Sequence, residues 1–316
     1  IRTTEIRHIR SAQTLWKTLF DNNQIYLSNY EGWYSIRDEA YYQESELKEI
    51  NGNYFTDNGS PVEWVKEESY FFRLSEWQDK LIKFYENNPN SISPKSRYNE
   101  VLSFIKGGLK DLSISRTTFN WGVPVPNDQK HVMYVWIDAL CNYLTAIGYP
   151  DISNNQFKKF WPANHIVGKD ILRFHAVYWP AFLMAAEIEP PNKIFAHGWW
   201  TNEGQKISKS LGNVIDPYEI IDLYGLDQIR YFLFREVPFG NDGDFSKDSI
   251  SNRINADLSN NYGNLVQRIL KFIVKNCNSK LTTTSDYNKS DNDLFEFFEN
   301  KFQEYLNFMN NYQIDK

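Results

Sequence analysis

The chain has 316 residues, of which 41% are hydrophobic and 23% are charged, and its formal net charge is −6. This composition is ordinary for a folded globular protein, and the length predicts two or more domains. The negative charge argues against a general nucleic-acid coat or a polybasic membrane binder, but it is compatible with a local basic site on an acidic surface.

The two cysteines and the apolar runs narrow the class of protein further. Cys141 and Cys277 are too few for a disulfide framework or a Cys-rich metal cluster, and two reduced thiols predict a cytoplasmic protein. The best candidate for a membrane segment, "AVYWPAFLMAA", has about half of the roughly 20 residues that a spanning helix needs, and it contains Pro180. We therefore expect no membrane partner.

The first part of the chain predicts a helix followed by a strand-rich module. Leu15, Trp16 and Leu19 recur at a helical spacing in "SAQTLWKTLFDN". Residues 25–115 then mix short strand-like runs, such as "PVEWVKEESYFF", with turn signals such as "DNGSP". This texture predicts a compact inserted module with its own small sheet and helices.

From about Arg116 the pattern alternates between strands and helices. "HVMYVWIDAL" and "NHIVGKDILRFHAVYWPAFLMAAEI" each predict a strand that runs into a helix, and "NKIFAHGWW" predicts a third strand. Such alternation is typical of a parallel sheet, in which binding sites form at the carboxyl ends of the strands.

Candidate binding residues share faces of these two helices. Trp136, Ala139 and Tyr143 stand at i, i+3 and i+7, so we expect them on one face. Ile171 and His175 are four apart and share a face of the next helix. For the aromatic residues, ordinary core packing is the alternative interpretation.

The segment "GQKISKSLGNVIDP" predicts a mobile basic loop. It carries Lys206, Ser208, Lys209 and Ser210 between Gly204 and Gly212. Ammonium groups on a hinged loop stabilise phosphate oxygens as negative charge builds up in a transition state. The P-loop spacing G-x-x-x-x-G-K-[ST] occurs nowhere in the sequence, and a solvated basic turn is the alternative interpretation.

Beyond about Ser251 the pattern becomes helical. Apolar residues recur at intervals of three or four in two runs, which are Leu258, Tyr262, Leu265, Ile269 and Phe272, and then Leu294, Phe298, Phe302, Tyr305 and Met309. These stripes predict a helical bundle, which we expect to be incomplete because few faces are available to bury them.

A polar face accompanies the first of these stripes. Asn261, Asn264 and Arg268 stand at i, i+3 and i+7, opposite much of the apolar run. Amide and guanidinium groups read the exposed bases of single-stranded loops, so this face is a candidate for nucleic-acid binding. An ordinary solvated face is the alternative.

Several of these segments together resemble one enzyme family. "KISKSLGNVIDP" is similar to the KMSKS signature of class I aminoacyl-tRNA synthetases. "MYVWIDAL", "NHIVGKDILRFH", "FAHGWWTNEGQKISKS" and "EGWYSIRDEAYY" look like the methionyl-tRNA synthetases, in the order expected for that family and over essentially the whole chain. The resemblance implies activation of methionine by ATP to methionyl-adenylate, followed by transfer to the 3′ end of tRNA(Met).

The resemblance also implies an α/β fold class and a division into domains. We expect a truncated Rossmann-type catalytic domain with an inserted α+β connective module, followed by a truncated all-α anticodon-binding bundle. The expected segments are 1–24 (the end of the first half of the nucleotide-binding fold), 25–115 (the connective module), 116–200 (the second half of the catalytic domain), 201–250 (the KMSKS loop and stem-contact region) and 251–316 (the incomplete anticodon-binding domain).

The residues that match the methionine site of the family are Trp136, Ala139, Tyr143, Asp170, Ile171 and His175. An aromatic pocket suits a thioether because sulfur gains from contacts with rings. Asp170 would pair with the substrate ammonium group, and a helix N-cap is its alternative role. Leu140 and Cys141 differ from the residues that many members carry after the alanine, at the rim of this pocket.

The residues that match the ATP site are Arg116, Gly198, Lys206, Ser208 and Lys209, and ATP with Mg²⁺ is the expected cofactor. Lys206 and Lys209 are the expected catalytic residues. A simple turn is the alternative for Gly198, and a surface salt bridge is the alternative for Arg116.

On the RNA side, Asn264 and Arg268 match residues that contact the CAU anticodon of tRNA(Met). A family tryptophan that stacks in the same site would lie beyond Lys316.

Two family features are missing from the sequence. The HIGH-type motif is absent, and we expect it upstream of Ile1, so we interpret the chain as a fragment cut at both ends that is a poor catalyst alone. Residues 25–115 contain no cysteine, so we expect no structural zinc and no other metal site.

Three alternatives compete with this interpretation. A synthetase for isoleucine, leucine or valine usually carries a large editing insertion, and residues 25–115 are too few to hold one. A non-catalytic tRNA-binding paralogue is disfavoured by the intact Lys206 and Lys209. A nucleotidyltransferase acting on another small molecule would leave the Asn264 and Arg268 face unexplained.

Overall fold

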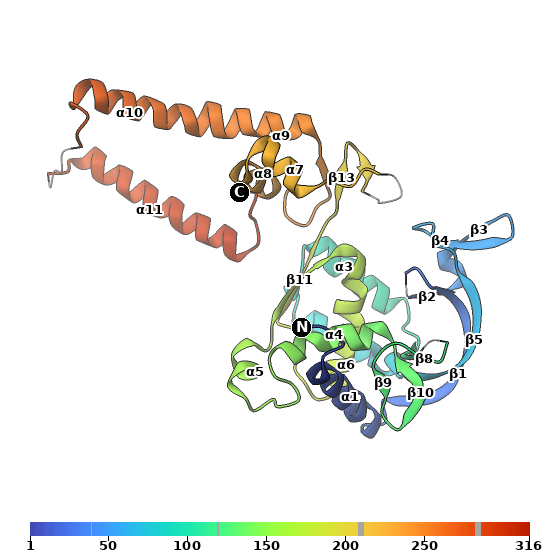
Figure 1. Cartoon of the computed structure of the whole chain (residues 1–316). Coiled ribbons are helices and arrows are strands. Elements are labelled where there is room, and N and C mark those ends of the chain that lie inside the picture. Colours follow the sequence, from blue (N-terminus) through green and yellow to red (C-terminus); the bar gives the residue numbers. More distant parts are fainter. Residues whose placement is uncertain (39, 119, 208–211, 282–285) are drawn as a thin grey trace. The chain divides into compact units, whose positions relative to one another are not determined.

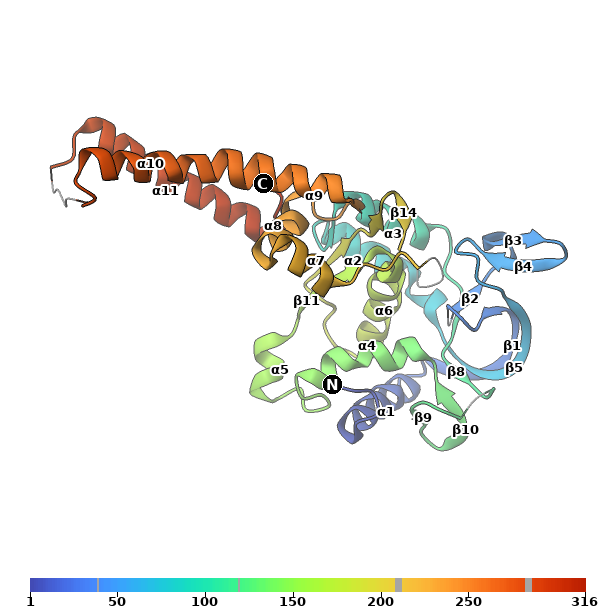
Figure 2. The same ribbon diagram turned by 45° about the horizontal axis from the view of Figure 1, so that its top comes forward.

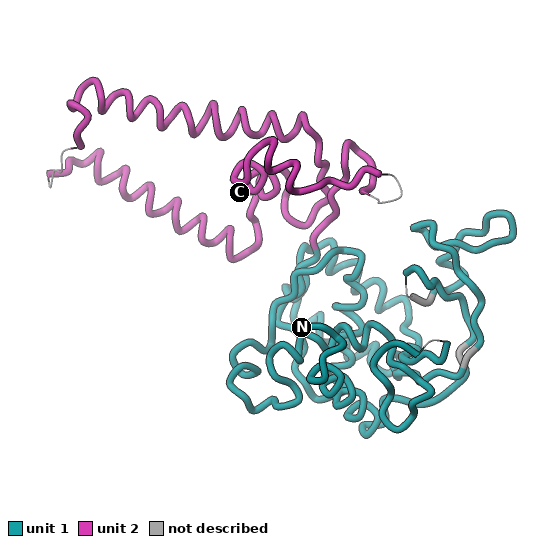
Figure 3. The backbone as a smooth tube through the Cα atoms, viewed as in Figure 1, with its two compact units in different colours: residues 1–196 teal, residues 197–316 magenta. Residues whose placement is uncertain are grey.

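The computed structural model describes residues 1–38, 40–118, 120–207, 212–281 and 286–316. The described chain forms two compact units, residues 1–196 and residues 197–316 (Figure 3). The five segments predicted from the sequence divide the chain more finely, and their boundaries stay a prediction.

Two helices that pack on each other anchor the first unit. Helix α1 (Ile6–Asp21) buries one face through Ala12, Leu15 and Leu19, as its helical spacing predicts. Helix α4 (Val135–Ala146) packs against α1 and buries the face that carries its aliphatic residues. The two helices are also joined by His8, whose Nε2 lies 2.5 Å from Asp138 Oδ1.

A long antiparallel ribbon forms the other side of this unit. Strands β1 (Ile25–Ser35) and β5 (Glu63–Phe72) pair along their length, and the ribbon curves visibly (Figures 1 and 2). The smaller strands of this region are β2 (Ala40–Tyr42), β3 (Leu47–Ile50), β4 (Asn53–Thr56) and β7 (Leu112–Ser113). Strands β2 and β7 extend the ribbon at its two edges, and β3 pairs with β4 as a separate hairpin.

Two small sheets lie next in chain order. One has the order β8 (Ser115–Arg116), β10 (Asp128–Met133) and β9 (Pro124–Val125). The other has the order β11 (Asn164–Gly168), β12 (Lys193–His197) and β6 (Ile92–Ser93). The prediction of a parallel sheet is right for β12, which pairs parallel with β6, but wrong for β10, which is antiparallel to both of its neighbours.

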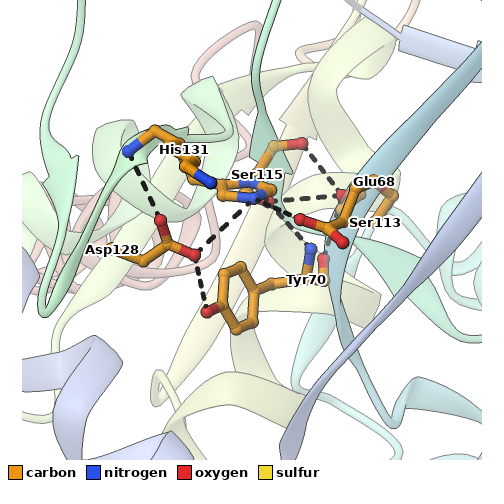
Figure 4. A network of polar contacts seen from close by, with 8 residues as sticks. Glu68, Tyr70, Ser113, Ser115, Asp128 and His131 are labelled. Atoms are coloured by element: carbon orange, nitrogen blue, oxygen red, sulfur yellow. Dashed lines mark hydrogen bonds and ion pairs between the residues drawn. The ribbon is translucent and has the colours of Figure 1, made fainter.

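A buried polar network joins the ribbon to the sheet of β10 (Figure 4). His131 Nδ1 lies 2.9 Å from Ser115 Oγ, and the Tyr70 amide donates to the same oxygen at 2.8 Å. The Tyr70 hydroxyl donates to Asp128 Oδ2 at 3.0 Å. His131 and Ser115 are fully buried, so these contacts satisfy the Ser115 hydroxyl and His131 Nδ1, which would otherwise be costly to remove from water.

The remaining helical elements of the first unit are η1 (Glu44–Glu46), η2 (Leu74–Trp77), α2 (Gln78–Asn87), α3 (Lys95–Lys106), α5 (Asn155–Phe160), η3 (Lys169–Ile171), η4 (Phe174–Tyr178) and α6 (Trp179–Ala185). Helices α1, α2, α3, α4 and α6 contribute buried side chains to one continuous hydrophobic core. This core fixes the positions of α4 and of the segment after β11, which carry the candidate site.

The second unit begins with a small sheet and three helices. The sheet has the order β14 (Gln205–Lys206), β13 (Trp200–Asn202) and β15 (Gly243–Phe245), and the helices are α7 (Pro217–Tyr224), α8 (Leu226–Arg235) and α9 (Lys247–Arg253). A small core of Ile229, Phe232, Phe245 and Ile250 holds these elements together.

The last part of this unit is helical, as predicted. Helix α9 continues into η6 (Ile254–Gly263), a π-helical stretch, and then into α10 (Asn264–Asn276), while α11 (Lys289–Asn310) follows separately (Figure 1). The wider turn of η6 breaks the 3.6-residue period before α10, so Asn261 does not stand at the predicted angular spacing from Asn264. The apolar stripes of α10 and α11 are largely exposed.

In the part of the chain that the structure describes, no helix is both long enough and apolar enough to cross a bilayer.

Candidate functional site

Helix α4 presents one partly exposed aromatic face. It starts directly after β10, so its first turns lie at the end of that strand. Trp136 and Ala139 are half-buried and Tyr143 is 37% exposed, whereas Ile137 and Leu144 on the other side are fully buried. The structure therefore places the three predicted residues on one accessible face.

The segment after β11 packs directly on this face. The rings of Trp136 and Phe174 stack with centroids 3.8 Å apart and planes within 8° of parallel. Tyr143 Oη lies 2.8 Å from His175 Nε2, and His175 Nδ1 lies 2.9 Å from the carbonyl oxygen of Ile171. Since that carbonyl can only accept, Nδ1 carries the proton and the Tyr143 hydroxyl donates to Nε2.

Burial keeps the imidazoles of this site neutral. His175 is 2% exposed, and its burial lowers the pKa below the ordinary value. His165, whose ring centroid is 4.3 Å from that of Tyr143, has its pKa lowered to about 4 by burial and by the neighbouring His175. This side of α4 is therefore aromatic and uncharged at neutral pH.

Two of these residues were not predicted. Phe174 stands next to His175 in the sequence, and this position could have marked it as a candidate site residue. Its stacking on Trp136, however, depends on the tertiary fold. His165 lies in β11, before the predicted helix. Only its ring contact with Tyr143 in the folded structure marks it as part of the site.

Asp170 and Ile171 lie in η3, at the entry to this segment. The Asp170 side chain is exposed, and its negative charge opposes the lowering of the His175 pKa. All six residues predicted for the amino-acid site thus lie on α4 or on the segment 170–175. Leu140 and Cys141, predicted at the rim, are instead residues of α4 that are buried in the hydrophobic core.

Arg116 lies elsewhere in the first unit, buried rather than in a surface salt bridge. It is 1% exposed, and its guanidinium carbon lies 4.6 Å from the ring centroid of Tyr134 and 5.1 Å from that of Tyr34. It donates to Ser113 Oγ at 3.1 Å and to the carbonyl oxygen of Ser115 at 2.5 Å. Arg116 lines a cavity of about 630 Å³, together with Trp121, Tyr134 and Asp138 among others.

Gly198 belongs to the second unit, where it is required by packing. A Cβ at this position would lie 2.2 Å from the carbonyl oxygen of Asn241 and 2.6 Å from the amide nitrogen of Asp242. No larger residue fits without displacing that backbone. The space that a side chain at position 198 would occupy is therefore taken by the backbone of Asn241 and Asp242. Any ligand must approach Gly198 from another side.

Lys206 lies in β14, at the base of the predicted basic loop. Its ammonium nitrogen is 5.4 Å from the ring centroid of Trp199, and the side chain is exposed. Ser208 and Lys209, the other loop residues predicted to act on ATP, fall outside the described residues.

Hydrogen bonds hold the two ends of this loop together. The Asn202 side-chain amide donates to the carbonyl oxygen of Asn213 at 2.8 Å, and the Asn213 side-chain amide donates to that of Lys206 at 3.0 Å. Asp244 Oδ1 accepts from the Thr201 hydroxyl at 2.6 Å and from the Gly204 amide at 2.7 Å. We call Asn202 and Asn213 the loop clamp. No pattern in the sequence identifies it in advance.

Asn264 and Arg268 lie on α10, and both are exposed. Asn264 donates to the carbonyl oxygen of Asn260 at 2.9 Å. Four residues separate the two along a regular helix, so they share a face as predicted.

Among the described residues, no three His, Cys, Asp or Glu side chains come together in a way that could hold a metal ion.

Comparisons with known proteins agree over most of the chain. The model of the family described as tRNA synthetases class I (M) matches residues 1–270. The methionine–tRNA ligase of Rickettsia prowazekii is 64% identical over 282 residues, which are 89% of this chain and 55% of that protein. The corresponding ligase of Brucella suis is 59% identical over 293 residues, or 92% of this chain and 57% of that protein.

A solved structure agrees equally well. The methionyl-tRNA synthetase of Mycobacterium tuberculosis in complex with methionyl-adenylate superposes with a TM-score of 0.94 at 48% identity, covering 100% of this chain and 62% of that one. This match confirms the predicted fold class. The chain spans about half the length of the curated relatives that it matches. It belongs to the class I tRNA synthetases, in the methionyl-tRNA synthetase family.

Proposed function

We propose that the complete gene product containing this chain is a methionine–tRNA ligase. It would activate methionine with ATP and transfer the methionyl group to the 3′ end of tRNA(Met), in the cytoplasm. The observation that carries this proposal is the aromatic face of α4 with its neutral His175 and Tyr143 pair, in a chain whose family is established.

The pocket chemistry fits an unbranched thioether. The rings of Trp136 and Tyr143 offer faces and edges to sulfur, and neutral imidazoles add no charge that an apolar side chain would have to desolvate. Ala139 and Ile171 are both half-buried and would add small and aliphatic surface to the site. Asp170 at the pocket entry would bind the ammonium group of methionine, which holds its carboxylate in a fixed direction.

The activation step is a displacement at phosphorus. A carboxylate oxygen of methionine attacks the α-phosphorus of ATP, a new P–O bond forms, and the bond to pyrophosphate breaks. Lys206 and Lys209 would stabilise the charge that accumulates on the phosphate oxygens, and Ser208 would donate a hydrogen bond. ATP would enter as its Mg²⁺ complex, in which the phosphates supply most of the metal ligands. Arg116 and Gly198 are the remaining residues assigned to ATP.

The tRNA assignment rests on α10. Asn264 and Arg268 are exposed side by side and have the donors and acceptors that unpaired bases require. We assign them to the CAU anticodon.

Exchange of labelled pyrophosphate into ATP tests the activation step. We expect the complete gene product to catalyse exchange with methionine and not with isoleucine or leucine, because the pocket is aromatic and fits a flexible thioether. Lys209→Ala is the control that should abolish most of the exchange. Exchange supported by isoleucine or leucine would reject the amino-acid assignment.

A further inference from the structure

Four of the six polar residues of α10 lie on one narrow face. Asn264, Arg268, Lys271 and Lys275 follow one another at intervals of four, three and four, which keeps all four side chains on one side of a regular helix. The apolar residues of α10, from Leu265 to Val274, occupy the remaining directions. We call Asn264, Arg268, Lys271 and Lys275 the basic stripe.

Charge is segregated between the two long helices of this unit. Helix α10 contains Arg268, Lys271 and Lys275 and no acidic residue. Helix α11, in contrast, carries five acidic residues and only two lysines. The whole chain has a net charge of −6, so a helix with three cations and no anion is a clear local exception.

The basic stripe is open to solvent. Asn264, Arg268, Lys271 and Lys275 are all exposed, and in the described part of the chain none of the three cations forms an ion pair. Cations elsewhere in this unit do form them, since Arg253 pairs with Glu236 at 3.0 Å and Lys301 pairs with Glu304. The three charges of the stripe are therefore available to a partner.

We propose that Lys271 and Lys275 bind phosphates of the same RNA strand whose bases Asn264 and Arg268 contact. This inference rests on the proposed tRNA substrate and extends it along the helix. From Asn264 to Lys275 the stripe is about 16 Å long at 1.5 Å per residue. That length spans several nucleotides of a helical strand, which places one phosphate about every 3.4 Å along its axis.

The residues at the two ends of the basic stripe suit different contacts with RNA. Lysine contacts a phosphate as a point charge without reading sequence, whereas an amide and a guanidinium offer directed donors to bases. The stripe has its amide at one end and its two lysines toward the other. An anionic membrane is the other partner suited to a basic amphipathic helix, but it would engage the apolar side of α10 rather than the Asn264 amide.

Titrating RNA binding against salt tests the proposal. The complete gene product would be compared as wild type, Lys271→Gln/Lys275→Gln and the matched control Lys301→Gln, which removes a lysine from α11. Glutamine has nearly the helix propensity of lysine, so α10 should persist. The probes are a synthetic RNA hairpin with a CAU loop, the same hairpin with a scrambled loop, and a phosphatidylserine vesicle.

The expected result is a weaker salt dependence. Each lysine lost should lower the slope of log K against log salt by about 0.7 to 0.9. At about 0.1 M salt the double variant should bind both hairpins roughly ten- to thirtyfold more weakly. The preference of the double variant for the CAU loop should match that of wild type, because phosphate contacts carry no sequence information.

Two results would overturn the proposal in different ways. A double variant with the slope and affinity of Lys301→Gln, or one that loses only vesicle binding, would show that the lysines do not contact RNA and would leave the tRNA assignment standing. A wild-type protein that binds the two hairpins equally weakly would remove the tRNA assignment together with this inference.

Discussion

His165 illustrates how burial sets the charge of a single residue. It is 4% exposed, and its pKa is lowered to about 4 from an ordinary value of 6.5. Between these two values the unfolded chain binds a proton that the folded chain excludes. The contribution of His165 to folding is thus complete above pH 6.5 and is lost progressively as the pH falls toward 4.

Unfolding in urea at several pH values tests this. Wild type should lose of the order of 3 kcal/mol of unfolding free energy between pH 7 and pH 4 through His165, because each unit of pKa shift corresponds to about 1.4 kcal/mol. In His165→Asn the fall should be smaller by that amount, although the variant is less stable at pH 7. Parallel pH dependences for the two proteins would contradict the assignment.

Single residues also show what sequence alone can and cannot provide. The i, i+3, i+7 spacing placed Trp136, Ala139 and Tyr143 on one face because a regular helix has a fixed period. The aromatic environment of Arg116 was not predictable, because Tyr34 and Tyr134 come from distant elements. Tyr34 lies on β1, and a charged side chain is ordinarily expected at the surface.

At the scale of elements, two errors have the same origin. Strand β10 was predicted as parallel because a strand followed by a helix usually belongs to a parallel sheet, but its pairing with β8 and β9 is antiparallel. The period through η6 was predicted as α-helical because the apolar residues fit it, yet the backbone there is π-helical. In both cases the local sequence pattern correctly indicated a strand or a helix. The pairing of the strand and the pitch of the helix were set by tertiary contacts.

The loop clamp is the element whose effect on activity is most directly testable. Asn213→Ala removes the donor to the Lys206 carbonyl oxygen, so Lys206 would be held less firmly. We expect the turnover of pyrophosphate exchange to fall about five- to tenfold, the worth of one hydrogen bond, with the KM for methionine unchanged. Asn192→Ala, which removes an exposed amide pair in the first unit, is the matched control. A rise in the methionine KM without a change in turnover would exclude this positioning role.

At the scale of the whole molecule, the candidate residues divide between the two compact units. The residues predicted to bind methionine and Arg116 lie in residues 1–196, and Lys206, Asn264 and Arg268 lie in residues 197–316. This division separates the predicted binding of methionine from the predicted recognition of tRNA.

Replacement of Arg268 by Ala should therefore affect one reaction only. We expect charging of tRNA(Met) to fall by about tenfold or more, because one directed base contact contributes about 1–3 kcal/mol. Methionine-dependent pyrophosphate exchange should be unchanged, because Arg268 lies on α10, whereas Lys206 lies on β14 and the residues assigned to methionine lie in the other unit. The rates of tRNA charging and of pyrophosphate exchange should be measured on the same preparation. A parallel loss of both rates would refute the anticodon assignment.

The general plan of the chain was accessible from sequence because its pieces are periodic. Amphipathic helices, a small sheet within residues 25–115 and a helical end were all expected, and all are present. The prediction that the helical end could not bury its stripes agrees with the exposure of Ile269 and Phe298. What could not be foreseen were contacts between distant segments, such as the close approach of Gly198 to Asn241.

The different burial of the two cysteines allows this chain to be labelled with a dye at one position. Cys141 is buried in the core and burial raises the pKa of its thiol, so it is protected from alkylation, whereas Cys277 is exposed immediately after α10. Within this chain a maleimide dye would thus attach selectively at Cys277, two residues beyond Lys275. Its fluorescence anisotropy would report docking at that end of the helix in real time, without any engineered substitution.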